Sequence, residues 1–220
     1  MTDSGDSYLT AAGRAEIETK VKGSRFVGRV FPVSSKDEAE AQVVELRKRD
    51  HDATHHCFAY SLRVGAGQSG ATFRFSDDHE PSGSAGKPIY DRLTGLGVTN
   101  TLVVVTRYFG GTKLGVGGLV RAYGEAAGLA LEKACLIEKF DYDEFALTID
   151  FSAYQGLQGL ISRVGGIVID SQFSENVQVR VNVRRSLADE FSREFIELTH
   201  GKWPITRDTH RESDGNASES

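Results

Sequence analysis

The sequence has few cysteines and no long apolar run, and both shortages exclude classes of protein. Cys57 and Cys135 are the two cysteines among 220 residues, and they form no CxxC pair. They provide no disulfide framework, which favours a reducing cytoplasm. No stretch approaches the roughly 18 apolar residues of a membrane span, and the N-terminus lacks the pattern of a secretion signal. We therefore expect a cytoplasmic protein without a membrane segment.

Net charge is also scarce once the two ends of the chain are set aside. The total is −5, of which residues 1–7 contribute −2 and residues 208–220 contribute −3, so residues 8–207 carry no net charge. Both ends are polar and acidic, and we expect residues 1–14 and 208–220 to be disordered. The net charge of the whole chain neither supports nor excludes nucleic acid as a partner. Evidence for nucleic-acid binding must therefore come from local clusters of basic residues.

The first part of the chain, residues 15–138, mixes strand and helix patterns. Ser35 and Glu38 form a capping-box pattern for a helix that ends near Arg49. Residues 101–109, TLVVVTRYF, are the strongest strand, and because Leu102–Val105 are apolar on both faces this strand should be central and covered. A long helix then follows to about residue 135, with Tyr123 in its apolar stripe. Further strands are expected in residues 15–32, 53–64 and 71–78, with a short helix near residues 89–96.

The second part, residues 141–207, has the pattern of strand, helix, two strands, helix, strand. A strand ends at Ser152, which with Gln155 resembles a capping box for a helix over residues 153–164. A hairpin turns at residues 174–176, and Ser186 precedes the next helix. This βαββαβ order is the ferredoxin-like arrangement. The sequence thus predicts two α+β domains, with a boundary near residues 138–141.

The most unusual stretch is RYFGGTKLGVGGLVRAYG, residues 107–124, with its glycines between the buried strand and the long helix. Such a turn presents unpaired backbone N–H groups at a helix N-terminus, where an anion is favoured. Three cationic side chains add positive charge. The candidate anion- or RNA-binding residues are therefore Arg107, Lys113 and Arg121 together with the glycines between them, namely Gly110, Gly111, Gly115, Gly117 and Gly118.

Two alternative roles of these glycines remain open. They can simply allow close packing of strand and helix, or they can serve a protein partner. The known phosphate loops do not fit, because Val116 stands where a Walker A motif needs lysine, and the GxGxxG pattern that starts at Gly115 fails at Val120.

A second loop, SDDHEPSGSAGKPIYD, carries Asp77, Asp78 and Glu80 ahead of Ser82 and Lys87. Such carboxylates can do acid–base work or hold Mg²⁺, but they can also form a solvated turn, cap backbone groups or pair with cations. If this loop and the glycine-rich stretch form one site, a carboxylate oxygen of residues 77–80 should lie within about 4 Å of a cationic nitrogen of residues 107–121.

Two further patterns do not indicate catalysis or metal binding. His55 and Cys57 point to one side of a strand and His56 to the other, so the three cannot ligate one metal ion. Ser82 and Ser84 lack the GxSxG spacing of a hydrolase. We therefore expect no catalytic residue and no metal.

A basic sheet face is the secondary candidate for RNA binding. Arg180 and Arg184 share one face of a strand, and Arg185 follows at its end. Aromatic side chains of the RRM type are missing from these positions, so a solvated face is the alternative.

Four stretches together resemble the Impact family, in particular its bacterial YigZ-like members: residues 24–26, 52–60, 76–89 and 99–124. The resemblance covers roughly residues 15–206. It implies a first domain like domain 2 of ribosomal protein S5 and a second like the ferredoxin-like domain V of elongation factor G. One departure is His79, where the family usually has glycine.

The resemblance also implies a translation-associated regulatory protein that binds RNA or the ribosome, or a protein partner in translation control, without sequence-specific DNA recognition. We expect no cofactor. The alternative is a guanine-nucleotide-binding protein or Mg²⁺-dependent nucleoside triphosphatase, with GTP and Mg²⁺ as ligands, although the Walker lysine is missing.

Overall fold

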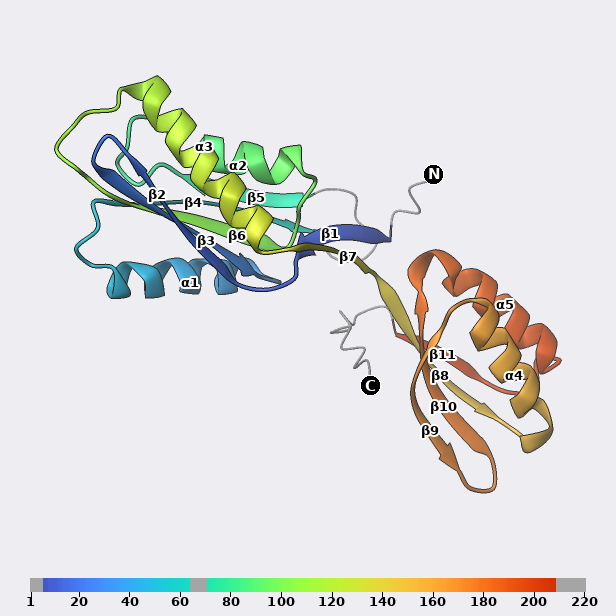
Figure 1. Ribbon diagram of the computed structural model, residues 1–220. Helices are drawn as coiled ribbons and strands as arrows, with labels where there is room; N and C mark the ends of the chain where they lie inside the picture. The colour runs from blue at the N-terminus through green and yellow to red at the C-terminus, as the bar shows by residue number, and fades with distance from the viewer. Residues whose placement is uncertain (1–5, 64–70, 209–220) are drawn as a thin grey trace. The chain divides into compact units, whose positions relative to one another are not determined.

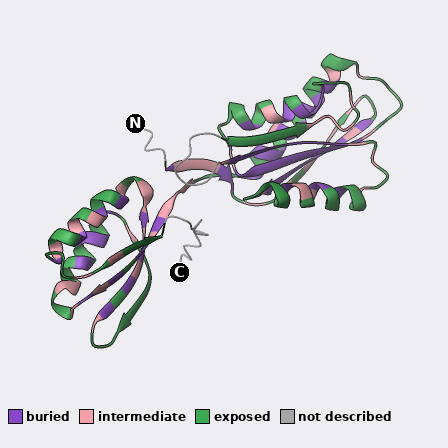
Figure 2. Cartoon of the chain, turned by 180° about the vertical axis from the view of Figure 1, so that it is seen from behind, coloured by how far each residue is buried: buried purple, intermediate pink, exposed green. Residues whose placement is uncertain are grey.

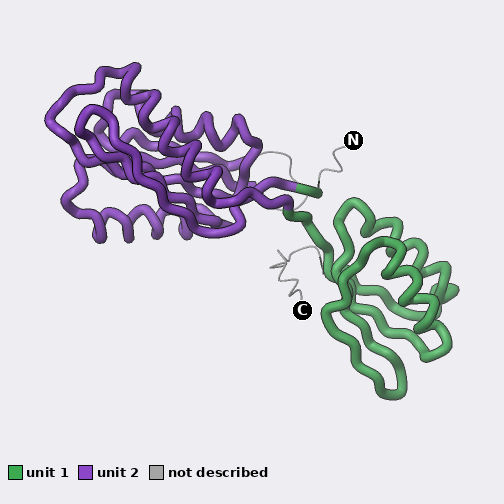
Figure 3. Tube along the Cα trace, in the orientation of Figure 1, with its two compact units in different colours: residues 1–7, 139–220 green, residues 8–138 purple. Residues whose placement is uncertain are grey.

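The computed structural model describes residues 6–63 and 71–208 (Figure 1). These residues divide into two compact units, and the chain passes from one to the other between Ser7 and Tyr8 and again between Glu138 and Lys139 (Figure 3). The first unit is Tyr8–Glu138, and the described part of the second is residues 6–7 with 139–208. The expected disorder of residues 1–5 and 209–220 lies outside the described residues.

The first unit contains a five-stranded antiparallel sheet in the order β2-β3-β6-β4-β5. Helix α1 covers one face, and α2 and α3 cover the other (Figure 1). The strands are β2 (Ala15–Val21), β3 (Ser24–Pro32), β4 (His55–Arg63), β5 (Ala71–Ser76) and β6 (Thr101–Tyr108), and the helices are α1 (Lys36–Arg49), α2 (Gly86–Gly95) and α3 (Val116–Lys133).

Strand β6 lies in the middle of this sheet, as its sequence predicts. Leu102–Val105 are all fully buried. Val103 and Val105 pack into the core beneath α2 and α3, whereas Leu102 and Val104 face α1. The buried residues of this sheet lie on its inner strands β3, β6 and β4, and Figure 2 colours them purple. The two-sided apolar run is therefore explained by helices on both faces.

The second unit has the predicted ferredoxin-like order. Its antiparallel sheet runs β11-β8-β10-β9, and helices α4 and α5 pack together on one face (Figure 1). The strands are β8 (Tyr142–Ile149), β9 (Ile167–Phe173), β10 (Val177–Arg184) and β11 (Ile205–Asp208), and the helices are α4 (Phe151–Arg163) and α5 (Ala188–Leu198), with a 3-10 turn at Arg185–Leu187 before α5.

The predicted start of α4 is wrong by two residues. Asp150, not Ser152, is the N-cap, and its carboxylate accepts a hydrogen bond from Ala153 N at 3.0 Å. Ser152 instead donates its hydroxyl to Asp150. An aspartate caps as well as a serine, so the local pattern offered two acceptable caps.

The expectation that residues 1–14 are disordered is wrong for β1 (Ser7–Ala11). This strand forms a two-stranded sheet with β7 (Leu136–Phe140), and Thr10 and Ala11 are buried. The distant strand β7 supplies its hydrogen-bonding partner, which local composition cannot reveal. No helix in the described ranges is long and apolar enough to cross a membrane.

Gly28 on β3 allows α3 to approach the sheet, and this gives a test of the packing. A Cβ at this position would lie 2.6 Å from Ala126 O of α3. We expect Gly28→Ala to lower the free energy of unfolding by about 1–3 kcal/mol through overpacking, measured by chemical denaturation. Gly13→Ala is the matched control, because a Cβ there meets nothing within 4 Å. Equal stability of the two variants would contradict the packing role.

Candidate functional site

The acidic loop (residues 77–85) and the glycine turn (residues 109–115) are joined by the expected ion pair. Arg107 Nη1, at the end of β6, lies 2.6 Å from Glu80 Oε1. The predicted contact is therefore confirmed. The pair is buried rather than exposed, however, because the two side chains are only 6% and 4% exposed. This burial gives the contact far more influence on stability than a surface ion pair has.

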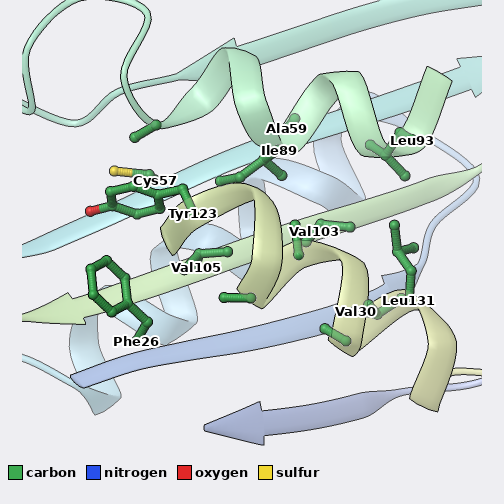
Figure 4. Close-up of a cluster of buried hydrophobic side chains, with 14 of the residues drawn as sticks. Phe26, Val30, Cys57, Ala59, Ile89, Leu93, Val103, Val105, Tyr123 and Leu131 are labelled. Carbon is green, nitrogen blue, oxygen red and sulfur yellow. The ribbon is translucent and has the colours of Figure 1, made fainter. Parts of the chain in front are cut away.

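Glu80 is held from two further elements. Tyr123 of α3 donates its hydroxyl to Glu80 Oε1 at 2.8 Å, and His55 Nε2 of β4 lies 3.7 Å from the same oxygen. Burial, assisted by the neighbouring Cys57 and Glu80, raises the pKa of Tyr123, so its hydroxyl stays neutral and acts as a donor. Figure 4 shows the Tyr123 ring beside Cys57 and Phe26 at one end of the core.

Arg107 also reaches the base of the glycine turn. Its Nη2 donates to Ser24 Oγ at 3.3 Å, and Gly110 N donates to the same oxygen at 3.2 Å. Its Nε is buried and has no hydrogen-bond partner within the described residues. The sequence places Arg107 among the cations that would meet an anion, but in the structure this guanidinium lies inside the protein as a link between the two loops.

Asp77 and Asp78 hold the acidic loop in place. Asp77 Oδ1 accepts from the backbone N–H groups of Ala85 and Gly86 at 2.9 and 2.8 Å, so it caps the start of α2. Asp78 Oδ2 accepts from His56 N at 2.7 Å, and its Oδ1 pairs with Arg47 Nη2 at 2.5 Å. Both carboxylates therefore cap backbone or pair with a cation, which is the ordinary alternative that the sequence left open.

The backbone of the acidic loop turns sharply at Asp78 and His79, where φ is +40° and +71°. These are left-handed conformations that glycine adopts most easily. His79 thus keeps the conformation that would suit a glycine. Ser82 is exposed, Ser84 is buried, and Lys87 pairs with Asp91 at 2.7 Å.

The three residues His55, His56 and Cys57 alternate across β4 as expected. Cys57 donates its thiol to Asp77 O at 3.1 Å, and burial raises the pKa of this thiol, which favours its protonated form. His56 faces the other side, near Thr106, and burial lowers its pKa. In the described part of the chain, no group of three or more His, Cys, Asp or Glu side chains could hold a metal ion.

The glycines of the turn fall into two groups. Gly110 packs against Gly23, since a Cβ on Gly110 would lie 1.9 Å from Gly23 C. Gly118 also has a close neighbour, whereas Gly111, Gly115 and Gly117 face open space or the end of a flexible side chain. Gly111 and Gly115 have φ of +85° and +72°. Close packing therefore explains why a glycine stands at the base of the turn, at Gly110. It does not explain the glycines at the tip, Gly111 and Gly115.

The start of α3 is exposed and uncapped. Its N-cap is Gly115, and no side chain caps the helix. Lys113 and Arg121 are both exposed beside it, and within residues 6–63 and 71–208 neither forms an ion pair. The Nη1 atom of Arg121 lies 3.8 Å from where a Cβ on Gly117 would be, so this cation lies over the start of the helix.

The secondary basic face is largely neutralised. Arg180 Nε donates to Glu144 at 2.6 Å, and Arg185 pairs with Asp141 and Asp143. Arg184 lies over the Phe140 ring at 3.7 Å. Carboxylates thus offset the charges of Arg180 and Arg185, whereas Arg184 keeps its positive charge over an aromatic ring.

The buried partners of the ion pair are not evident from the sequence. Tyr123 falls in the apolar stripe of the long helix, and Ser24 lies in the turn expected between the two strands of residues 15–32. One signal that the sequence does offer is the tyrosine itself, because a buried Tyr hydroxyl usually finds a hydrogen-bond partner.

Comparisons with known proteins cover nearly the whole chain. Residues 22–131 match the Impact N-terminal domain, and residues 147–202 match a domain of unknown function, DUF1949. The IMPACT family member YigZ of Escherichia coli is 34% identical over 89% of this chain and 95% of its own length. For the IMPACT family member YvyE of Bacillus subtilis the identity is 33%, over 90% of both chains. A solved structure described as a hypothetical protein is 32% identical, with a TM-score of 0.64 over 94% of this chain and 99% of its own.

The buried ion pair predicts a large effect of removing one partner. Glu80→Ala leaves the guanidinium of Arg107 buried without its counter-charge, and we expect the free energy of unfolding to fall by about 3–5 kcal/mol, measured by denaturant titration. The control is Glu125→Ala, which replaces an exposed glutamate on α3. It should change the free energy of unfolding by no more than about 0.5 kcal/mol. If both variants lose a similar, small amount of unfolding free energy, the ion pair does not organise the two loops.

Proposed function

The chain belongs to the Impact family, and from this membership and the exposed start of α3 we propose that it regulates translation by binding RNA or the ribosome through the glycine turn. The contact surface comprises the tip of the turn, the first residues of α3, and the side chains of Lys113 and Arg121. Its ligand group is the phosphate of the RNA backbone.

The observation that carries this proposal is the uncapped N-terminus of α3 beside two cations that form no ion pair with the described residues. The helix begins at Val116, and its first backbone hydrogen bond runs from Leu119 N to Gly115 O. The N–H groups before Leu119 therefore lack a side-chain cap. Such groups, together with the helix dipole, favour an anion at this position.

The bare backbone at the tip supports close approach by a phosphate. Gly111 and Gly117 have no packing neighbour that requires glycine, so their open surroundings are available to a ligand. Arg107 does not contact the phosphate in this proposal; it fixes the base of the turn through Ser24. Phosphate contacts position a nucleic acid without reading its sequence. The proposed partner is therefore recognised by its shape or by its place on the ribosome, and not by its base sequence.

Replacing both exposed cations tests the proposal. We expect Lys113→Ala/Arg121→Ala to weaken binding of a single-stranded RNA by about tenfold, since each exposed charge contact contributes up to about 1 kcal/mol. The log–log dependence of affinity on salt should also flatten by about 0.7 per lost phosphate contact. Fluorescence anisotropy at several salt concentrations measures both quantities.

The matched control is Lys36→Ala/Lys48→Ala. It removes the same charge from α1, which covers the opposite face of the sheet, and should leave the affinity and the salt slope close to those of the unmodified protein. If both double variants lose the same amount of RNA affinity, binding depends on overall charge and not on the glycine turn.

The alternative of GTP binding with Mg²⁺ has less support from the geometry. Each of Asp77, Asp78 and Glu80 is already engaged by backbone N–H groups or by a cation, so a metal ion would have to displace these partners. We expect calorimetry with GTP and Mg²⁺ to show no saturable micromolar binding. Binding that disappears in Asp78→Asn would instead support the nucleotide alternative.

A further inference from the structure

A second surface feature lies in the ferredoxin-like unit, where the start of α4 meets the residues that follow α5. It is an open pocket of about 320 Å³, which is at the lower end of the size range of small-molecule sites. The residues that line it and matter here are Asp150, Gly156, Leu198, His200, Lys202 and Trp203.

The apolar wall of the pocket is built by Trp203 and Leu198. Trp203 packs partly against the core of this unit, so its ring is held in place. Gly156 lets the Leu198 side chain pack directly over α4, because a Cβ there would lie 2.7 Å from Leu198 Cδ1. A flat aromatic ring beside an aliphatic side chain suits a planar ligand, since stacking on aromatic side chains is the usual way in which proteins hold unpaired bases.

The polar side of the pocket has both signs of charge. Asp150 Oδ2 lies 3.1 Å from Lys202 Nζ, and hydrogen bonds from Ser152 and Lys202 lower the pKa of Asp150 to about 2. Lys202 Nζ also lies 5.0 Å from the centre of the Trp203 ring. Because the carboxylate already has a cation beside it, the pocket does not suit a simple cation as ligand.

These groups match the three parts of one nucleotide. We propose that the pocket binds a ribonucleotide, with the base against Trp203, a ribose hydroxyl donating to Asp150, and the phosphate beside Lys202 and His200. The side chain of Lys202 is 65% exposed, so its ammonium group can follow a phosphate at the pocket mouth. This site belongs to a different unit from the glycine turn and does not depend on it.

The single tryptophan of the sequence gives a direct readout, because Trp203 is part of the proposed site. Titration of the full chain with adenosine 5′-monophosphate should quench its fluorescence in a saturable manner. Inorganic phosphate alone should not quench it, and 2′-deoxyadenosine 5′-monophosphate should bind about tenfold more weakly, because one hydrogen bond to the carboxylate is lost. A single-stranded oligoadenylate distinguishes an RNA strand from a free nucleotide: tighter binding per site than that of the monophosphate identifies the strand as the ligand.

Two variants test the assigned roles. Asp150→Asn keeps a good helix cap and should reduce the preference for ribose over deoxyribose, because a neutral amide forms a weaker hydrogen bond with the hydroxyl than a carboxylate does. Lys202→Ala should weaken the affinity for the monophosphate by about tenfold. The affinity for adenosine, which has no phosphate, should stay unchanged. Arg193→Ala is the control, because this exposed arginine on α5 does not line the pocket.

Failure of this proposal and failure of the glycine-turn proposal are separable. Lys113→Ala/Arg121→Ala should leave the quenching of Trp203 unchanged. Absence of quenching at millimolar nucleotide, equal quenching by inorganic phosphate, or identical behaviour of Asp150→Asn, Lys202→Ala and Arg193→Ala would each overturn the assignment of a ribonucleotide to this pocket.

Discussion

The ion pair between Arg107 and Glu80 is the contact on which the arrangement of the candidate site depends. It joins the end of the central strand to the acidic loop, and the same carboxylate oxygen accepts a hydrogen bond from the hydroxyl of Tyr123 on α3. A buried pair gives up its hydration, and only good geometry and additional hydrogen bonds offset that cost. Tyr123 and Ser24 provide such hydrogen bonds. The pair therefore fixes two loops and a helix with one set of contacts.

The glycines of the turn serve two structural purposes: close backbone packing at its base and positive φ angles at its tip. At its base, Gly110 and Gly23 bring two backbones into contact, and Ser24 connects Gly110 N to Arg107. At its tip, Gly111 and Gly115 adopt positive φ without close neighbours. At the proposed site, a packed base with an open tip would hold the exposed N–H groups in position before a ligand arrives.

Much of the fold could be predicted from the sequence, because periodicity and capping are local. The two-sided apolar run at Leu102–Val105 identified the central strand, and strand and helix order identified the ferredoxin-like unit. The contact between the loops was predicted from complementary composition. Local patterns could not show that β1 pairs with β7, nor that Arg107 is buried, because both depend on segments far apart in the chain. For the same reason the role of Tyr123 was not visible.

Pairing, rather than the number of charges, determines where an anion can bind. Residues 8–207 have no net charge, so total charge alone offers an anion no preferred place. Arg29, Arg107 and Arg180 each have a carboxylate within 3 Å, and such internal partners compete with any external anion. Lys113 and Arg121 have no such partner among the described residues, and they lie at a helix N-terminus whose dipole adds to their charge. The glycine turn therefore combines free cations with bare backbone, while the acidic loop supplies the carboxylate that keeps Arg107 inside the protein.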